Sequence, residues 1–248
     1  MKKIFIRFKL VFISFCFFSC ASSNFSFTES DSVAVVGVSG NKNLSEQVDT
    51  LYVRSDEEDL DDTSVLSTVV DKFLHGENPE LLTAQERVDY GEEYLRSALA
   101  NIAGVRVTPK EDVLNSEQYK NAALNPLGMF TTWIPATGFD KNLYSIGAKK
   151  ARLMMSELGV SRLVTAEFRF NKIFADESKV KTNVRAQVIM DVLVYDEKGK
   201  IVVMKSFDAV SDEKLEVKNF KYDTEALVAL YPSVIEIAVN KFVVSYMN

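Results

Sequence analysis

Apolar and polar side chains alternate most regularly between residues 162 and 207, and this pattern predicts three β-strands. In residues 162–171 and 184–195, one face is apolar at nearly every second position. A charged turn with one glycine, residues 196–200, leads into a third strand at residues 201–207. Because the links are short, we expect an antiparallel meander that packs on one side.

Apolar residues spaced three and four apart predict helices. One helix follows Thr83, which forms a capping box with Glu86, and it stops at Gly104. Its apolar stripe consists of Val88, Gly91, Leu95, Ala98, Leu99 and Ile102. Further helices are expected at residues 63–74 and at residues 145–158, the second of which is ended by a glycine.

The C-terminal segment, residues 224–247, also has a helical pattern, interrupted at Pro232. Its polar positions cover only a narrow stripe, so it is expected to be buried against a sheet, a partner or lipid. We favour packing in the core over insertion into a membrane.

Short apolar strands at residues 33–38 and 105–108 complete the predicted order, which is β-α-α-β-α-β-β-β-α. This order predicts the α+β class, with a mixed sheet whose three-stranded antiparallel meander is covered by helices. We assign residues 33–248 to a single domain.

Residues 1–19 have the pattern of a secretion signal, with four positive residues and the apolar run 10–18. That run is well short of the roughly 20 residues needed to cross a bilayer. The next residue, Cys20, follows a serine and resembles the acylated cysteine of a bacterial lipobox, although Phe17 replaces the usual leucine. We predict lipid on Cys20; the alternative is an ordinary secretory signal with a chance cysteine. Residues 20–32 then form the lipidated N-terminus and a polar spacer.

Removal of residues 1–19 changes the charge and the cysteine content. It removes four positive charges and no negative ones, which leaves 25 Lys and Arg against 35 Asp and Glu, a net charge of −10. Such an acidic body is unsuited to nucleic acids and gains nothing from an anionic membrane surface. With no cysteine after Cys20, disulfides, thiolate catalysis and zinc–thiolate sites are excluded.

The residues that catalysis and metal binding require are sparse. His75 is the only histidine, so histidine metal clusters are excluded and a Ser-His-Asp triad would depend on it alone. The acidic stretch 56–62 lacks the spacing of a calcium loop, and no glycine-rich phosphate loop follows a strand. We expect a protein that is not an enzyme and that has no cofactor or metal.

Residues 109–144 contain several prolines and glycines and are expected to form an irregular loop. This loop contains four aromatic residues: Phe130, Trp133, Phe139 and Tyr144. Long loops often carry binding sites, and aromatic side chains supply much of the contact energy at interfaces. We predict that these four residues bind a partner; the alternative is a lid folded over the helices.

Three stretches resemble a family of bacterial envelope domains that includes CsgG, LpoB and the N-terminal domain of TolB. They are residues 33–38 with the Gly40-Asn41 turn, residues 148–165 (AKKARLMMSELGVSRLVT), and residues 191–202, which are paired strands around a charged turn. The resemblance would span most of residues 33–247 and implies a periplasmic part of a larger assembly. A pore of the CsgG type is not expected, because residues 179–195 show no lipid-facing band.

These observations predict a lipid-anchored lipoprotein on the periplasmic face of the outer membrane, which binds another envelope protein in assembly, scaffolding or regulation. The alternative is an outer-membrane lipoprotein that inserts an amphipathic segment into lipid or carries an apolar ligand. Self-association and the identity of the partner stay open. Ala21 favours the outer over the inner membrane.

Overall fold

The computed structural model describes residues 25–48, 79–122, 132–141, 143–177, 180–219 and 221–247. In chain order, the elements are β1 (Ser32–Asn41), β2 (Ser45–Val48), α2 (Pro79–Leu82), α3 (Ala84–Asn101), β3 (Arg106–Val107), α4 (Lys110–Asn115), α5 (Glu117–Lys120), β4 (Trp133–Pro135), α6 (Ala148–Leu158), β5 (Arg162–Glu177), β6 (Val180–Tyr195), β7 (Ile201–Val210), β8 (Leu215–Glu216), α7 (Thr224–Ala229) and α8 (Tyr231–Ser245). The predicted helix at residues 63–74, the acidic stretch 56–62 and His75 lie outside the described residues.

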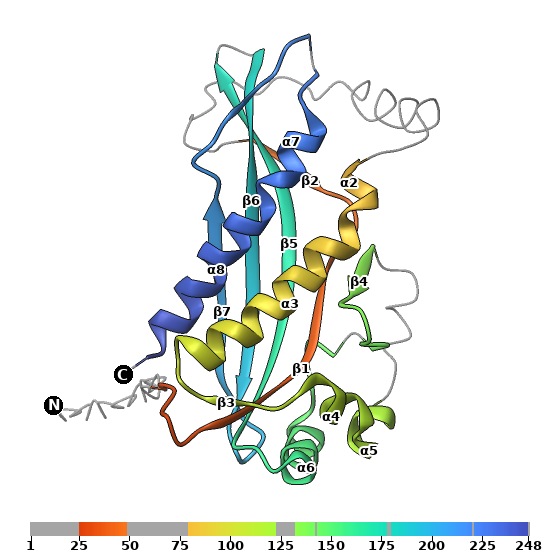
Figure 1. Cartoon of the computed structure of the whole chain (residues 1–248), viewed down its shortest axis with the longest axis vertical. Coiled ribbons are helices and arrows are strands. Elements are labelled where there is room, and N and C mark those ends of the chain that lie inside the picture. Colours follow the sequence, from red (N-terminus) through yellow and green to blue (C-terminus); the bar gives the residue numbers. More distant parts are fainter. Residues whose placement is uncertain are drawn as a thin grey trace, which may run out of the picture.

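The strands form one sheet with the main order β3-β1-β5-β6-β7, to which β2, β4 and β8 add at the sides (Figure 1). β5, β6 and β7 are antiparallel neighbours, with Glu167 opposite Asp191 and Asp191 opposite Ser206. The predicted meander is therefore confirmed. β1 lies parallel to β5, so the sheet is mixed, and the α+β class is confirmed as well.

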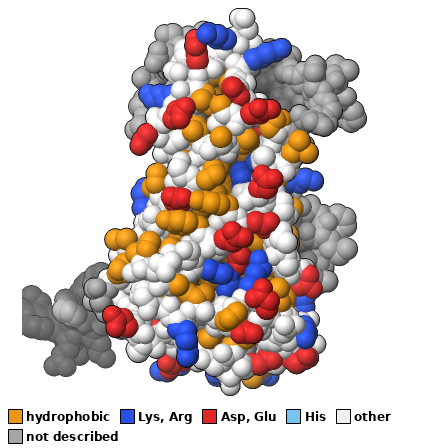
Figure 2. Space-filling model, in the orientation of Figure 1, with side chains coloured by type: hydrophobic (Ala, Val, Ile, Leu, Met, Phe, Trp, Pro, Cys, Tyr) orange, Lys and Arg blue, Asp and Glu red, His pale blue; other side chains and the backbone are white. Residues whose placement is uncertain are grey.

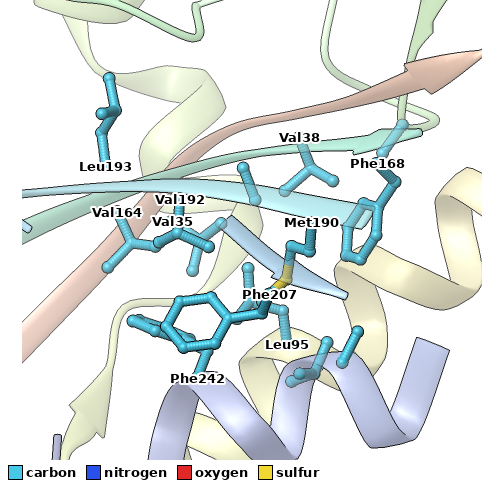
Figure 3. Packing of buried hydrophobic residues seen from close by; sticks show 14 of the residues in the cluster. Val35, Val38, Leu95, Val164, Phe168, Met190, Val192, Leu193, Phe207 and Phe242 are labelled. Carbon is cyan, nitrogen blue, oxygen red and sulfur yellow. The ribbon is translucent and has the colours of Figure 1, made fainter. Parts of the chain in front are cut away.

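Helices α3 and α8 cover one face of this sheet (Figure 1). The covered face carries the buried apolar residues of the alternating pattern: Val164, Ala166, Phe168 and Phe170 in β5, and Val184, Ala186, Val188, Met190, Val192 and Val194 in β6. Phe207 of β7 meets Phe242 of α8 in this layer, with ring centroids 5.5 Å apart, whereas Leu193 points to the other side of the sheet (Figure 3). The core thus lies between the sheet and these two helices.

Gly91 allows α3 to lie close to the sheet. A Cβ atom at this position would come within 2.8 Å of Cε2 of Phe168. Four other residues of the predicted stripe are buried: Val88, Leu95, Ala98 and Leu99. After the helix, Gly104 has φ +68°, which an L side chain rarely adopts, and this explains why the helix stops before it.

The predicted capping box at Thr83 is wrong. No side-chain hydrogen bond caps α3, and Oγ1 of Thr83 instead donates to the carbonyl oxygen of Pro79 (2.7 Å). The reason is that α2 directly precedes α3, so the hydroxyl bonds to the turn before it. A four-residue helix such as α2 is too short to show an apolar period.

The C-terminal segment forms two helices, α7 and α8, with the break at Leu230 and Pro232 in the first turn of α8. Thr224–Ser245 is the one stretch of the described residues that is long and apolar enough to cross a membrane, judged by length and composition. However, α8 buries seven residues against α3, β6 and β7: Tyr231, Val234, Ile235, Ala238, Val239, Phe242 and Val243. Core packing of this segment is therefore confirmed.

The segment 109–144, expected to be irregular, contains α4, α5 and β4 in its described part. Oγ of Ser116 accepts a hydrogen bond from the backbone N–H of Tyr119 (3.2 Å) and caps α5. Helices of four and six residues and a strand of three leave no period for a pattern search to find. The expectation of a structureless loop was therefore too simple.

Candidate functional site

Cys20 and Phe130, two of the predicted functional residues, lie outside the described residues. The other three aromatic residues of the predicted contact surface, Trp133, Phe139 and Tyr144, are described, as is the chain from Phe25 onward. Two places in the structure therefore bear on the predictions: the start of the described chain and the surroundings of Trp133.

The start of the described chain packs against the end of α8 in an aromatic cluster that we call the tether corner: Phe25, Phe27, Phe207, Phe242 and Tyr246. Phe27 is 2% exposed, and its ring lies 5.0 Å from that of Phe25 and 6.0 Å from that of Phe242. Phe25 and Phe27 thus pack on the domain, within the stretch that we expected to be a spacer. The two phenylalanines are the signal in this serine-rich segment that the sequence analysis missed.

Backbone contacts hold the same segment in place. The N–H of Phe27 donates to the carbonyl oxygen of Tyr246 (2.7 Å), and a parallel bridge joins Phe27 to Met247. The two ends of the described chain therefore lie side by side, as Figure 1 shows.

Asp31 fixes the chain between the tether corner and β1. Its carboxylate accepts a hydrogen bond from Oγ of Ser161 (2.8 Å) and pairs with Arg162 (3.2 Å). Burial alone would raise the pKa of Asp31, but hydrogen bonds from Ser161 and Thr28, together with the charge of Arg162, lower it. Asp31 is therefore held as an anion.

The second place is β4 with its flanking residues 132–137, which we call the Trp133 edge. β4 pairs antiparallel with β1, with Trp133 opposite Asn41, and no other described strand pairs with it. Trp133 is half-buried. A partly exposed tryptophan on an outer strand can supply contact area to a partner.

Asp89 of α3 clamps the Trp133 edge to the domain. Its carboxylate accepts two hydrogen bonds from Thr137, one from the backbone N–H and one from Oγ1, both at 2.6 Å. Nε2 of Gln85 donates to Oδ1 of Asp89 (2.9 Å) and to the carbonyl oxygen of Pro135 (3.0 Å). Burial would raise the pKa of Asp89, but the bonds from Thr137 and Gln85 and the charge of Lys110 lower it. The clamp is therefore anionic.

Phe139 and Tyr144, the other two described aromatic residues of the predicted surface, make contacts of their own. Phe139 is 4% exposed, packs edge-on against Tyr119 (5.9 Å between centroids) and lies under Nζ of Lys110 (4.9 Å). Burial here removes Phe139 from the predicted contact surface. Tyr144 is half-buried, its carbonyl oxygen accepts a hydrogen bond from Thr165 (2.6 Å), and burial raises the pKa of its hydroxyl to about 12.

A buried charged cluster that lies farther along β5, away from the tether corner (Figure 1), was not predicted. Nζ of Lys172 lies 3.2 Å from the carboxylate of Glu80 and 3.0 Å from the hydroxyl of Tyr222, which itself donates to Glu80 (2.8 Å). These contacts join β5, α2 and the chain before α7. The sequence signal is a lysine two positions after Phe170 in strand β5, where the alternating pattern assigns the side chain to the buried face.

The described residues offer no group of three or more His, Cys, Asp or Glu side chains that could hold a metal ion. An open depression of about 360 Å³ lies between α4, α5 and α6. Two carboxylates, Asp112 and Glu157, line it, and Glu157 accepts hydrogen bonds from the backbone N–H groups of Glu117 (2.6 Å) and Gln118 (2.9 Å). That side chain thus satisfies two further N–H groups of the first turn of α5, beside the cap from Ser116.

No family model and no curated protein matches the chain. Among solved structures, it is similar to the LpoB C-terminal domain from Salmonella enterica, with 10% identity and a TM-score of 0.27, over 74% of this chain and 83% of that one. It is also similar to the hypothetical protein CT253 from Chlamydia trachomatis, with 14% identity and a TM-score of 0.31, over 84% of this chain and 97% of that one. Both similarities are distant, so the proposals that follow rest on the contacts of this chain.

Proposed function

We propose that this protein is a lipoprotein of the bacterial cell envelope, anchored by acyl chains on Cys20, that binds another envelope protein through the Trp133 edge. It serves assembly, scaffolding or regulation and is not an enzyme. The N-terminal sequence supports the anchor, since a short apolar signal ends at Ser19-Cys20. Export and acylation together would place the domain at the periplasmic face of a membrane, which we take to be the outer one.

The observation that carries this proposal is the placement of the tether corner and the Trp133 edge. β1 starts at Ser32, shortly after the tether corner, and ends at Asn41, which pairs with Trp133. Ten residues of strand cover roughly 30 Å. A partner can therefore reach Trp133 while Cys20 remains in the membrane.

The anchor is tested by intact-mass measurement of the mature N-terminus and by labelling with radioactive palmitate. We expect a chain that begins at Cys20 with added acyl mass, and no label in Cys20→Ala. A mature chain that begins elsewhere, or carries no acyl group, would contradict the proposal. Each acyl CH₂ contributes about 0.8 kcal/mol of membrane affinity, so the acylated form should stay with the membrane after a salt wash.

The contact surface is tested by co-purification in mild detergent. Trp133→Ala should lose a partner that the unchanged protein retains, because the edge loses its largest apolar side chain. Tyr94→Ala, a half-buried aromatic residue on α3, is the matched control and should retain the partner. Equal recovery with both variants, with unchanged circular dichroism spectra, would exclude the Trp133 edge.

The alternative function, an interaction with lipid by the protein part itself, predicts a different result in liposome flotation. Retention of Cys20→Ala on liposomes would favour that alternative. Loss of Cys20→Ala from the floating fraction would favour the proposed lipoprotein, whose membrane binding depends on its acyl chains.

A further inference from the structure

The last turns of α8, which ends at Ser245, and the residues just after it expose apolar side chains beside the tether corner. Val244 is 60% exposed and Met247 is 40% exposed, whereas their neighbours Phe242 and Val243 are fully buried. Ile237, also 40% exposed, lies seven residues before Val244 and therefore on the same side of the helix. Figure 2 shows apolar side chains on this part of the surface.

The chain geometry places this surface close to the predicted lipid. Phe25 is packed in the tether corner, and only four residues separate it from Cys20. Five residue steps span at most about 18 Å, even when fully extended. An acylated Cys20 therefore keeps Phe25 within about 18 Å of the headgroup layer, and Tyr246 at the end of α8 packs against Phe25.

Two lysines flank the exposed apolar side chains. Nζ of Lys241, three residues before Val244, donates to the carbonyl oxygen of Asp208 (2.6 Å). Nζ of Lys205 lies 5.3 Å from the ring centroid of Phe207, in the tether corner. Exposed apolar residues beside lysines with long alkyl stems are typical of surfaces that rest on a membrane interface.

We propose that the end of α8, through Val244 and Met247, contacts the headgroup layer of the bilayer that holds Cys20. This inference rests on the proposed acylation of Cys20. The contact gives the domain a fixed orientation. α2, α7 and the free end of the β5–β6 hairpin then point away from the membrane, because they lie at the other end of the molecule (Figure 1).

The experiment is spin-label accessibility in the acylated protein, reconstituted in liposomes of phosphatidylethanolamine and phosphatidylglycerol. The acylated Cys20 carries a thioether, and the mature chain has no other cysteine, so Val244→Cys and Met247→Cys can each be labelled alone. Leu82→Cys is the matched control, since Leu82 is an apolar residue on α2 that is 63% exposed. The readout is the ratio of accessibility to oxygen, which concentrates in lipid, over that to a water-soluble nickel complex.

We expect the oxygen-to-nickel ratio to rise on liposomes for labels at positions 244 and 247 and to stay unchanged at position 82. If the protein floats with the liposomes but the label at position 244 gives the same ratio as the label at position 82, the contact is overturned and the anchor is kept. Protection of position 244 from both reagents, with broadening between labels, would show a second copy in place of lipid and would also overturn it. Protein that fails to float would overturn the anchor and this contact together.

Discussion

The tether corner and the Trp133 edge are both additions to the same sheet, yet they are held in different ways. At the tether corner, Phe27 is almost fully buried among other aromatic rings. At the Trp133 edge, the aromatic side chain is half-buried, and hydrogen bonds to the carboxylate of Asp89 hold the strand.

This difference suits the two regions to different roles. Apolar packing stabilises a contact at every pH, because its free energy depends on the apolar area withdrawn from water and not on a charge. Hydrogen bonds to a single carboxylate fix the position of a strand but leave its side chains free for other contacts, and they depend on the charge of that carboxylate. The first arrangement suits an anchor point, and the second suits a contact surface.

The largest effect is expected at the tether corner. Phe27→Ala should lower the free energy of unfolding by about 3 kcal/mol, because a fully buried ring is removed from a packed cluster. Urea denaturation followed by circular dichroism measures this change. Faster hydrogen exchange at residues 25–31 should accompany it.

Phe25→Ala is the matched control, since this ring is only half-buried and lies at the outer side of the cluster. It should cost clearly less than Phe27→Ala. If both changes cost the same, or if Phe27→Ala costs nothing, residues 25–31 behave as the spacer that the sequence first predicted.

The sequence predicted the central part of the fold well. Alternation in β5 and β6 was readable because one face of each strand is buried under α8 and α3 while the other carries polar pairs such as Arg169 with Asp191 (2.8 Å). The α3 stripe was readable for the same reason, and Gly91 could be included because it lies at stripe spacing. Patterns of this kind survive in a sequence whenever a long element has one buried face.

The ends of the sheet were not predicted, because their contacts are formed by short segments far apart in the chain. Phe27 meets the residue next to the C-terminus, and Thr137 meets Asp89 across 48 positions. The sequence after Thr83 matches a capping box, but the Thr83 hydroxyl donates instead to the carbonyl oxygen of Pro79 in α2. The polar composition of residues 21–32 likewise hid two phenylalanines whose partners lie more than 200 residues away.

The second prediction concerns the clamp. Asp89→Ala should lower the free energy of unfolding by about 2 kcal/mol, because two hydrogen bonds from Thr137 to a charged acceptor are lost. The amide of Thr137 should exchange faster with solvent. Glu93→Ala, at an exposed position of the same helix, is the control and should leave both quantities unchanged.

The clamp should also respond to pH. The folded state lowers the pKa of Asp89, so its contribution to stability is present above the pKa of the unfolded chain, about 3.9, and is lost as the pH falls through the lower folded value. The emission of Trp133, the single tryptophan, should shift to longer wavelength in this range. Asp89→Asn should lack this transition; a transition that persists in Asp89→Asn would assign it to another carboxylate.

The smallest effect on stability is expected for Trp133→Ala, although the side chain is larger than Phe27. Part of the indole surface is already in contact with water, whereas Phe27 is 2% exposed, so removal of the indole should cost about 1 kcal/mol, measured by urea denaturation with circular dichroism. Trp133→Ala and Phe27→Ala thus compare the removal of an aromatic side chain from a partly exposed position with its removal from a buried one. If Trp133→Ala lowered the free energy of unfolding as much as Phe27→Ala, the indole would be a structural residue. The distinction between an anchor point and a contact surface would then fail, whatever the co-purification experiment showed.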